Sequence, residues 1–276
     1  MDLADPADPV DLVPPDDRLV GCWERSLLTT ADGRRDTTTD VTWLQGRTFY
    51  VDLRTAALAA DLSGVACLRD LSTEQALALA ATEGFAGVLA ADGPWARWVR
   101  LVDLQPPAPA LDEGRLVQHA DRVIETGRDG SYQEHWHRAE RATTPTAGLL
   151  LRETTTGATG VLVRVGEDVG WASGRAVPLT DGRSLAEHVA AAASTEDAQD
   201  LLGTEVATGR VGPGGIVLTR TSLPWRTGAL LDVTPAGDRL ATSDQAADGS
   251  AVRRTWEVLA REGEQAHLLD CLSENA

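Results

Sequence analysis

Residues 125–138, ETGRDGSYQEHWHR, hold the densest run of polar side chains in the 276-residue sequence. On a β-strand alternate side chains share a face, so Tyr132, Glu134 and Trp136 would point together into an interior. A carboxyl group inside an apolar barrel has a raised pKa unless an arginine or hydrogen bonds keep it ionised. Such a group can serve as a general acid or base. The predicted catalytic pair is therefore Glu134 and, on the neighbouring strand, Glu125.

The opposite face of the same strand carries His135 and His137. A His-x-His pair on a strand can bind a metal ion, and His119 or Glu125 could complete the ligand set. No further ligand spacing supports a metal, and a histidine pair facing solvent outside a barrel is the simpler interpretation. We therefore predict no metal and no other cofactor, and keep His135 and His137 as the alternative.

Two further hairpins carry aromatic and charged side chains that could line the same interior. Tryptophan dominates the aromatic residues, with eight Trp against two Phe and two Tyr, and each Trp combines a large flat face with one N–H donor. A filled barrel core, or an Arg–Glu pair closing the barrel end, would use the same residues. We predict a pocket beside Tyr132 and Trp136 that is lined by Trp43, Asp52, Arg54, Trp95, Arg97 and Trp98. Arg54 or Arg97 would then bind an acidic group on the ligand.

The apolar residues recur mostly with a period of two, and Gly, Asp and Pro turns separate the runs. In the first half, the runs predict strands at 18–29, 38–45, 47–54, 84–91, 95–104, 115–118, 121–127 and 130–138. In the second half, they predict strands at 147–154, 160–166, 168–176, 204–211, 214–221, 226–233, 238–242 and 251–260. Eight antiparallel strands close into a barrel whose interior holds packed side chains or one small ligand.

Two capping-box patterns predict helices between these strands. Ser72 is followed three residues later by Gln75, and Ser184 is followed by Glu187. In such pairs each side chain bonds the backbone N–H of the other residue, which starts a helix. The first pattern predicts a short helix within residues 70–82, and the second predicts a helical insert over 184–202.

The two halves of the chain resemble each other segment by segment. The paired segments are 39–54 with 159–175, 87–100 with 208–220, and 115–136 with 239–256. A Ser-capped helix follows the first pair, and the last pair shares an Asp-Gly-Ser turn before a strand with a Trp. We predict a mainly β fold of two fused antiparallel barrels from an internal duplication, although common turn chemistry could also produce the likeness. The predicted parts are a disordered acidic leader at 1–17, a first barrel at 18–143 and a second barrel at 147–276.

The segment GCWERS, residues 21–26, resembles the Gly-x-Trp start of the lipocalin/calycin superfamily. The larger layout is similar to a fungal family of two-barrel, lipocalin-like proteins whose biochemical role is poorly defined. The segments that carry this resemblance are WLQGRTFYVDLR, VIETGRDGSYQEHW and LLLRETTTGATGVLVRV. The resemblance implies lipocalin-like barrels, and it supplies no catalytic residues for transfer to this chain.

Composition excludes several function classes. A net charge of −17 argues against nucleic acid or an anionic membrane surface as a partner. All 25 basic residues are Arg, so no lysine is present for Schiff-base chemistry or a Walker A loop. No signal peptide or apolar run long enough to span a membrane occurs, and we expect a soluble, cytoplasmic protein.

These observations favour a small-molecule-binding protein that holds an apolar or aromatic, optionally acidic, ligand in a Trp-lined barrel. The first alternative is a cofactor-independent isomerase, hydro-lyase or cyclase that uses Glu125 or Glu134 as its acid or base. The second alternative is an interaction protein whose barrels are filled. Trp43 and Asp52 have no counterpart in the 159–175 segment, so the first barrel is expected to be the functional half.

Overall fold

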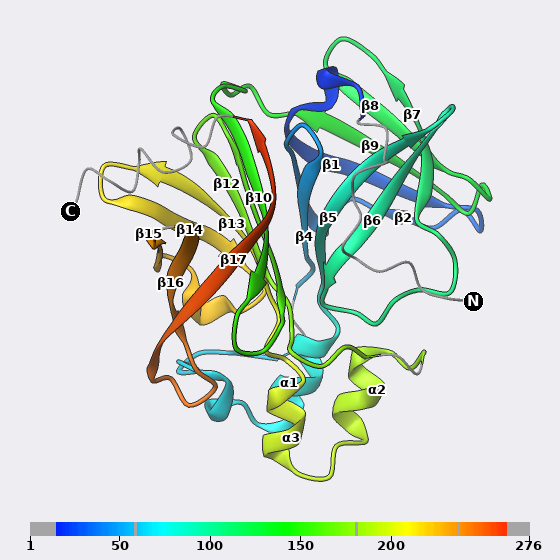
Figure 1. The fold of residues 1–276 in the computed structure, drawn as a ribbon. Helices are drawn as coiled ribbons and strands as arrows, with labels where there is room; N and C mark the ends of the chain where they lie inside the picture. Colours follow the sequence, from blue (N-terminus) through cyan, green and yellow to red (C-terminus); the bar gives the residue numbers. More distant parts are fainter. Residues whose placement is uncertain (1–14, 58–59, 180–181, 237, 264–276) are drawn as a thin grey trace.

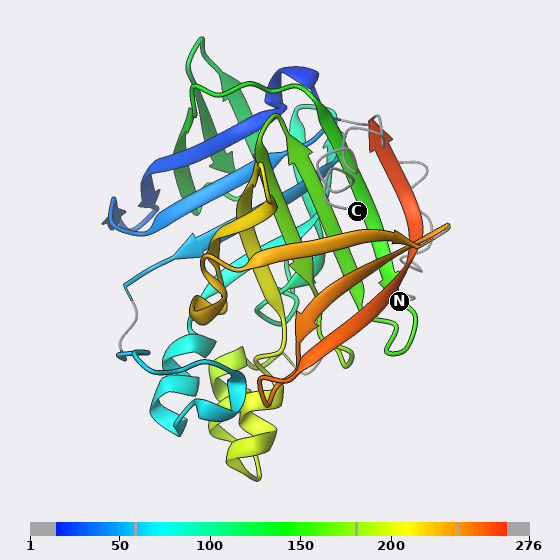
Figure 2. The ribbon, with the colours of Figure 1, turned by 90° about the vertical axis from the view of Figure 1, so that its left-hand side faces the viewer.

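Two antiparallel β-sheets, each closed into a barrel, are the main feature of the computed structural model, which describes residues 15–57, 60–179, 182–236 and 238–263. The barrels lie side by side, and three short helices form a layer at one end of both (Figures 1 and 2). The predicted mainly β, two-barrel fold is confirmed. Among the described residues no helix is long and apolar enough to cross a membrane.

The first barrel follows the order of its strands along the chain, and β1 closes it by pairing with β9. Its strands are β1 (Gly21–Thr30), β2 (Arg35–Asp36), β3 (Asp40–Gln45), β4 (Phe49–Thr55), β5 (Glu83–Asp92), β6 (Trp95–Asp103), β7 (Glu113–Gln118), β8 (Arg122–Gly127) and β9 (Tyr132–Arg138). The short β2 pairs with the far end of β1, beyond the segment that pairs with β3. Only β2 was not predicted from the sequence.

The second barrel has the same strand order and closes between β10 and β17. Its strands are β10 (Thr146–Glu153), β11 (Thr159–Val165), β12 (Asp168–Ser173), β13 (Glu205–Gly212), β14 (Gly215–Thr221), β15 (Leu230–Ala236), β16 (Arg239–Gln245) and β17 (Ala251–Gly263). The strand predicted at 226–233 starts later, because Pro224 opens a 3-10 turn, η4 (Pro224–Arg226). The three paired sequence segments occupy equivalent places in the two barrels, which an internal duplication would produce.

Helices form where the capping boxes predict them. In α1 (Thr73–Ala80) the Ser72 hydroxyl accepts from the Gln75 N–H at 3.2 Å. The predicted insert at 184–202 is divided into α2 (Leu185–Ala190) and α3 (Thr195–Asp200), because Ser194 caps a new helix. The three helices pack on one apolar cluster below both barrels, together with η3 (Leu68–Asp70).

The predicted leader at 1–17 lies outside the described residues as far as residue 14. From there the chain enters a 3-10 turn, η2 (Asp17–Leu19), which Asp16 caps by accepting from the Arg18 N–H. Leu19 then contacts the first barrel, because the Trp23 indole N–H donates to its carbonyl at 2.7 Å. The Arg138 guanidinium lies 4.4 Å from the Trp23 ring and covers this end of the barrel.

The barrels join through an apolar layer formed by the outward faces of β3, β4, β5 and β6 against those of β10, β11, β12 and β13. Phe49, Val51 and Leu53 of β4 are buried in this layer. Glu262 of β17 reaches across it and accepts backbone N–H bonds from the turn between β3 and β4, at 3.0, 2.6 and 3.1 Å. Burial raises the pKa of Glu262, although these N–H groups favour its charged form.

Gly170 of β12 lies in this layer and allows a test of how closely the two barrels pack. An added Cβ at Gly170 would lie 2.7 Å from the Val51 side chain, a contact that forces backbone or side-chain movement. We expect Gly170→Ala to lower the free energy of unfolding by about 1–3 kcal/mol in urea denaturation. Gly214→Ala is the matched control, because its added Cβ meets nothing within 4 Å. Equal stability of the two variants would contradict close packing between the barrels.

Candidate functional site: a polar cavity in the first barrel

A cavity of about 400 Å³ lies inside the first barrel. Inward-facing side chains of β3, β4, β6, β8 and β9 supply its aromatic and acidic walls. Its lining residues are Leu28, Thr30, Trp43, Asp52, Arg54, Glu83, Phe85, Trp98, Arg100, Asp112, Glu125, Ser131, Tyr132, Glu134 and Trp136. Trp43 packs edge-on against Trp98 and Trp136, with ring centroids 6.0 and 5.5 Å away. The volume suits a small organic molecule.

Most of the residues predicted for the pocket line this cavity. They are Trp43, Asp52, Arg54, Trp98, Glu125, Tyr132, Glu134 and Trp136. They come from hairpins far apart in the sequence, and barrel closure brings them together. Trp23 lies in the interior apolar cluster of the same barrel and does not line the cavity.

The predictions for Trp95 and Arg97 were wrong. Both belong to the face of β6 opposite Trp98, because neighbouring strand residues alternate between the two faces. Arg97 pairs with Glu113 at 2.8 Å on the outside of the barrel. The Arg128 guanidinium lies 5.2 Å from the Trp95 ring on the same outer face. Neither side chain can therefore bind a ligand in the cavity.

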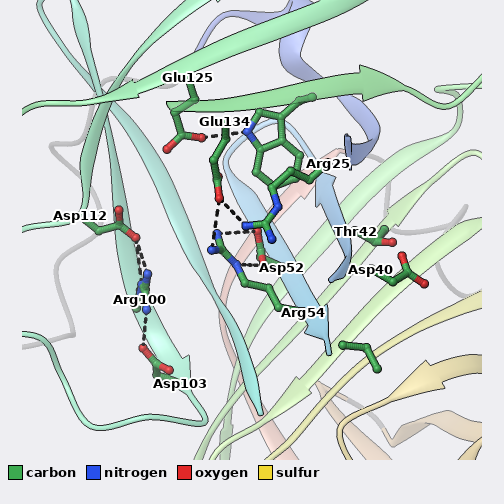
Figure 3. Close-up of polar contacts among 12 residues, drawn as sticks. Arg25, Asp40, Thr42, Asp52, Arg54, Arg100, Asp103, Asp112, Glu125 and Glu134 are labelled. Atoms are coloured by element: carbon green, nitrogen blue, oxygen red, sulfur yellow. Dashed lines mark hydrogen bonds and ion pairs between the residues drawn. The ribbon is translucent and has the colours of Figure 1, made fainter. Parts of the chain in front are cut away.

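Glu134 is the centre of the buried ion-pair network (Figure 3). Its carboxylate lies 2.6 Å from the Arg25 guanidinium and 3.5 Å from that of Arg54. Arg54 also donates to Asp52 at 2.9 Å. Burial raises the pKa of Asp52, and the Arg54 charge opposes this rise. Burial disfavours the Arg54 cation, but Asp52 and Glu134 hold its pKa well above the usual range.

Glu125 has a different environment, although it lies directly opposite Glu134 on the paired strands β8 and β9. It accepts hydrogen bonds from the Tyr132 hydroxyl at 2.7 Å and from the Trp136 indole N–H at 3.1 Å. Burial, and after it the nearby Glu134 carboxylate, raise the pKa of Glu125 to about 8. The Tyr132 hydrogen bond and the Arg54 charge act in the opposite direction. Glu125 is therefore a carboxyl group that can exchange a proton near neutral pH.

Two glycines make room for this carboxyl group and its partner. Gly114 of β7 and Gly127 of β8 face each other across the strand pair. An added Cβ at Gly114 would lie 3.0 Å from the Glu125 side chain, and one at Gly127 would lie 2.6 Å from the Tyr132 ring. The absence of two side chains thus allows the Glu125–Tyr132 contact.

From the sequence we did not predict Glu83, Phe85, Arg100 or Asp112, which line the cavity. We also did not predict Arg25, which pairs with Glu134. Arg100 pairs with Asp112 at 2.6 Å and lies 3.5 Å from the centre of the Phe85 ring. A sequence signal existed for Arg25, because it is two residues from Trp23 and therefore shares its strand face. Asp112 lies in a loop, where no periodicity marks an inward residue.

The histidine alternative receives no support from the geometry. His135 and His137 lie on the outer face of β9, whereas Glu125 points into the barrel. His135 contacts Gln133 at 3.2 Å. Among the described residues, no group of three or more His, Cys, Asp and Glu side chains could hold a metal ion.

At one end of the second barrel, buried Glu205 pairs with Arg226 at 2.8 Å beside a hollow of about 140 Å³. The rest of its interior is a mainly apolar cluster. Trp171 and Trp256 pack edge-on there, with ring centroids 5.5 Å apart. Leu, Val, Ile and Ala side chains complete the cluster. Trp256 is fully buried and donates its indole N–H to Thr242 at 2.9 Å.

A second hollow of about 590 Å³ adjoins the cavity beside α1. The two spaces share Leu28, Arg54 and Glu83 as lining residues. Leu77 and Ala78 of α1 belong to the mainly apolar wall of this hollow. The polar cavity and the more apolar hollow therefore meet at the end of the barrel that faces the helices.

Comparisons with known proteins assign no family. No family model and no curated protein matches the chain. The crystal structure of the uncharacterized protein YLR301w from Saccharomyces cerevisiae is similar at 13% identity and a TM-score of 0.49, over 88% of this chain and 98% of that chain. The β subunit of DNA polymerase III from Thermotoga maritima aligns at 10% identity and a TM-score of 0.14, over 92% and 81% of the two chains. Neither similarity carries a functional assignment.

Arg25 should be essential to the stability of the first barrel. Its side chain is 4% exposed and that of Glu134 is 3% exposed. Arg25→Gln removes one partner of a buried ion pair, so we expect a loss of about 3–5 kcal/mol in the free energy of unfolding. Arg34→Gln is the control, because its 79% exposed side chain pairs with Asp32 in solvent and should contribute about 0–1 kcal/mol. Similar losses in urea titrations of the two variants would contradict this assignment.

The Glu125 titration predicts how stability depends on pH. The ordinary pKa of this group is 4.5 and its folded pKa is about 8, so the folded state retains a proton that the unfolded chain releases. The stabilisation that this proton gives the folded state is complete below about pH 4.5 and is lost as the pH rises towards 8.

Relative to that of Glu125→Gln, the free energy of unfolding of the wild-type protein should therefore fall by about 1.4 kcal/mol per pH unit between about pH 4.5 and pH 8. Urea unfolding from pH 5 to pH 9 measures the difference. Glu24→Gln is the control, because this side chain is 56% exposed. Its free energy of unfolding should change with pH in the same way as that of the wild type. A constant difference between wild type and Glu125→Gln would show that Glu125 does not titrate in this range.

Proposed function

We propose that this protein binds a small molecule in the cavity of the first barrel. The cavity itself carries this proposal: a space of about 400 Å³ lies between Trp rings and buried carboxyl groups inside the first barrel, against a hollow of about 140 Å³ at one end of the second. Trp43, Trp98 and Trp136 offer apolar faces to the ligand. The hypothesis of two filled barrels receives no support from this cavity.

The acidic ligand considered from the sequence has little support in the geometry. Arg97 lies outside the barrel, and Arg54 already pairs with Asp52 and Glu134. An anionic ligand would have to displace one of these carboxylates or remain unpaired in a buried site. We therefore narrow the proposal to a ligand with an aromatic or apolar body and no negative charge.

A lipocalin-like assignment is part of this proposal. The closed eight-stranded barrel begins at a Gly-x-Trp segment, Gly21 to Trp23, whose indole is buried. Barrels of this size commonly hold one small ligand in their interior. The arrangement supports a calycin-type binding function for the first barrel.

A second candidate function is catalysis without a cofactor, and Glu125 is the observation that favours it. A buried carboxyl group with a pKa of about 8 can deliver or accept a proton at neutral pH. Glu134, fixed by Arg25 at 2.6 Å, would then stabilise charge and would not transfer a proton itself. An isomerase or lyase would use Glu125 in this role, and Glu125→Gln would then retain binding and lose turnover.

Leu28 offers a direct test of the binding proposal, because its side chain lines both the cavity and the adjoining hollow. N-phenyl-1-naphthylamine, a neutral fluorescent probe, should bind the wild-type protein and quench its tryptophan emission. We expect Leu28→Trp to fill the shared opening and weaken binding of this probe at least tenfold in a fluorescence titration. Val217→Trp adds the same ring to the exposed outer face of β14 and should leave the affinity unchanged. Equal affinity in both variants would place the probe elsewhere and contradict the proposal.

A further inference from the structure

Carboxyl groups outnumber guanidinium groups around the cavity. The acidic lining residues are Asp52, Glu83, Asp112, Glu125 and Glu134, and the basic ones are Arg54 and Arg100. Arg25, which lines the adjoining hollow, adds a third guanidinium through its contact with Glu134. The site therefore has an excess of acid even when this arginine is included.

Each of the three guanidinium groups is already neutralised. Arg25 binds Glu134 at 2.6 Å and Asp36 at 2.8 Å. Arg54 binds Asp52 and Glu134, as described above. Arg100 binds Asp112 at 2.6 Å and, through its other nitrogen, Asp103 at 3.0 Å. Two acidic partners for each arginine leave none of the three available for an anionic ligand, and they add to the negative charge near the cavity.

Among the buried acids that line the cavity, Glu125 alone has no guanidinium partner in the described part of the chain. It is 4% exposed, and its two oxygens contact only the Tyr132 hydroxyl and the Trp136 indole N–H among the described hydrogen-bond donors. The cavity wall thus holds a carboxyl group without a cation partner.

We infer that the ligand of the first barrel is an organic cation, an amine with an aromatic or apolar body. This inference rests on the proposed small-molecule binding and specifies the class of ligand. The ammonium group would supply the positive charge that the arginines do not provide to Glu125. Trp43, Trp98 and Trp136 surround the same space, and the faces of indole rings attract cations. The apolar body would extend towards Leu28 and the adjoining hollow.

Binding of such a cation is coupled to a proton. The charged groups near Glu125 are Glu134 of the paired strand, Arg54 of β4 and Asp112 before β7, and Tyr132 is its hydrogen-bonding neighbour. An added ammonium charge favours the carboxylate form of Glu125, so its O–H bond breaks and the proton passes to the buffer. The amine itself stays protonated, and no other bond changes.

Three probes of similar size and different charge test the inference. At pH 7, 2-phenylethylamine is a cation, 2-phenylethanol is neutral and phenylacetate is an anion. We expect the amine to bind at least tenfold more tightly than the alcohol, and phenylacetate to bind more weakly than either, in isothermal titration calorimetry at low salt. The amine should also release up to one proton, measured from the apparent enthalpies in phosphate and in Tris buffer.

Glu125→Gln is the matched variant, because its amide keeps the shape: the amide oxygen can accept from the Trp136 indole N–H, and the amide NH2 can donate to the Tyr132 hydroxyl, whose hydrogen bond reverses direction. We expect it to lose the preference for the amine and the proton release, and a cooperative urea unfolding transition checks that it is folded. Equal affinities of the wild-type protein for amine and alcohol would overturn the inference, as would tighter binding of phenylacetate.

The outcomes also separate this inference from the proposed function. Binding of N-phenyl-1-naphthylamine in a Leu28-dependent manner, without any binding of the amine, would overturn the cation class and leave small-molecule binding intact. If neither N-phenyl-1-naphthylamine nor the amine, the alcohol or phenylacetate binds, the cation class and the proposed small-molecule binding are both overturned. An amine preference that persists unchanged in Glu125→Gln would reject the role assigned to Glu125.

Discussion

Two carboxyl groups placed directly opposite each other on β8 and β9 determine how the interior of the first barrel is organised. Two buried negative charges at that spacing repel each other strongly, so they need different environments. Glu134 is compensated by Arg25 and Arg54 and remains in an ion-pair network. In the described part of the chain, Glu125 has only neutral hydrogen-bond donors, Tyr132 and Trp136, and its proton replaces the missing cation. The raised pKa of Glu125 and the expected pH dependence of stability follow from this asymmetry.

Strand periodicity and turn chemistry were sufficient to predict both barrels, because alternation and Gly or Asp turns act locally along the chain. The same periodicity, applied consistently, would have placed Trp95 and Arg97 on the face opposite Trp98 and would have identified Arg25 from Trp23. The cavity itself could not be predicted. Its volume depends on the approach of strands far apart in the sequence, and on glycines that leave space only once the register is fixed.

The two barrels share a topology and differ in how much of the interior is an apolar core. In the centre of the second barrel, Trp171 and Trp256 are surrounded by aliphatic side chains. In the first barrel, the aliphatic positions are partly replaced by Asp, Glu, Arg and Tyr, which need partners and cannot pack as densely as hydrocarbon chains. Such an interior is maintained at a cost in stability, which is common at functional sites.

Strand β4 belongs to both parts of the molecule. Its Val51 and Leu53 are buried against the second barrel, while Asp52 and Arg54, between and beside them, line the cavity. The second barrel is packed against this strand and limits how far the cavity wall can move. The second barrel then acts as a rigid backing for the first, and a fragment with the first barrel alone would expose a broad apolar surface.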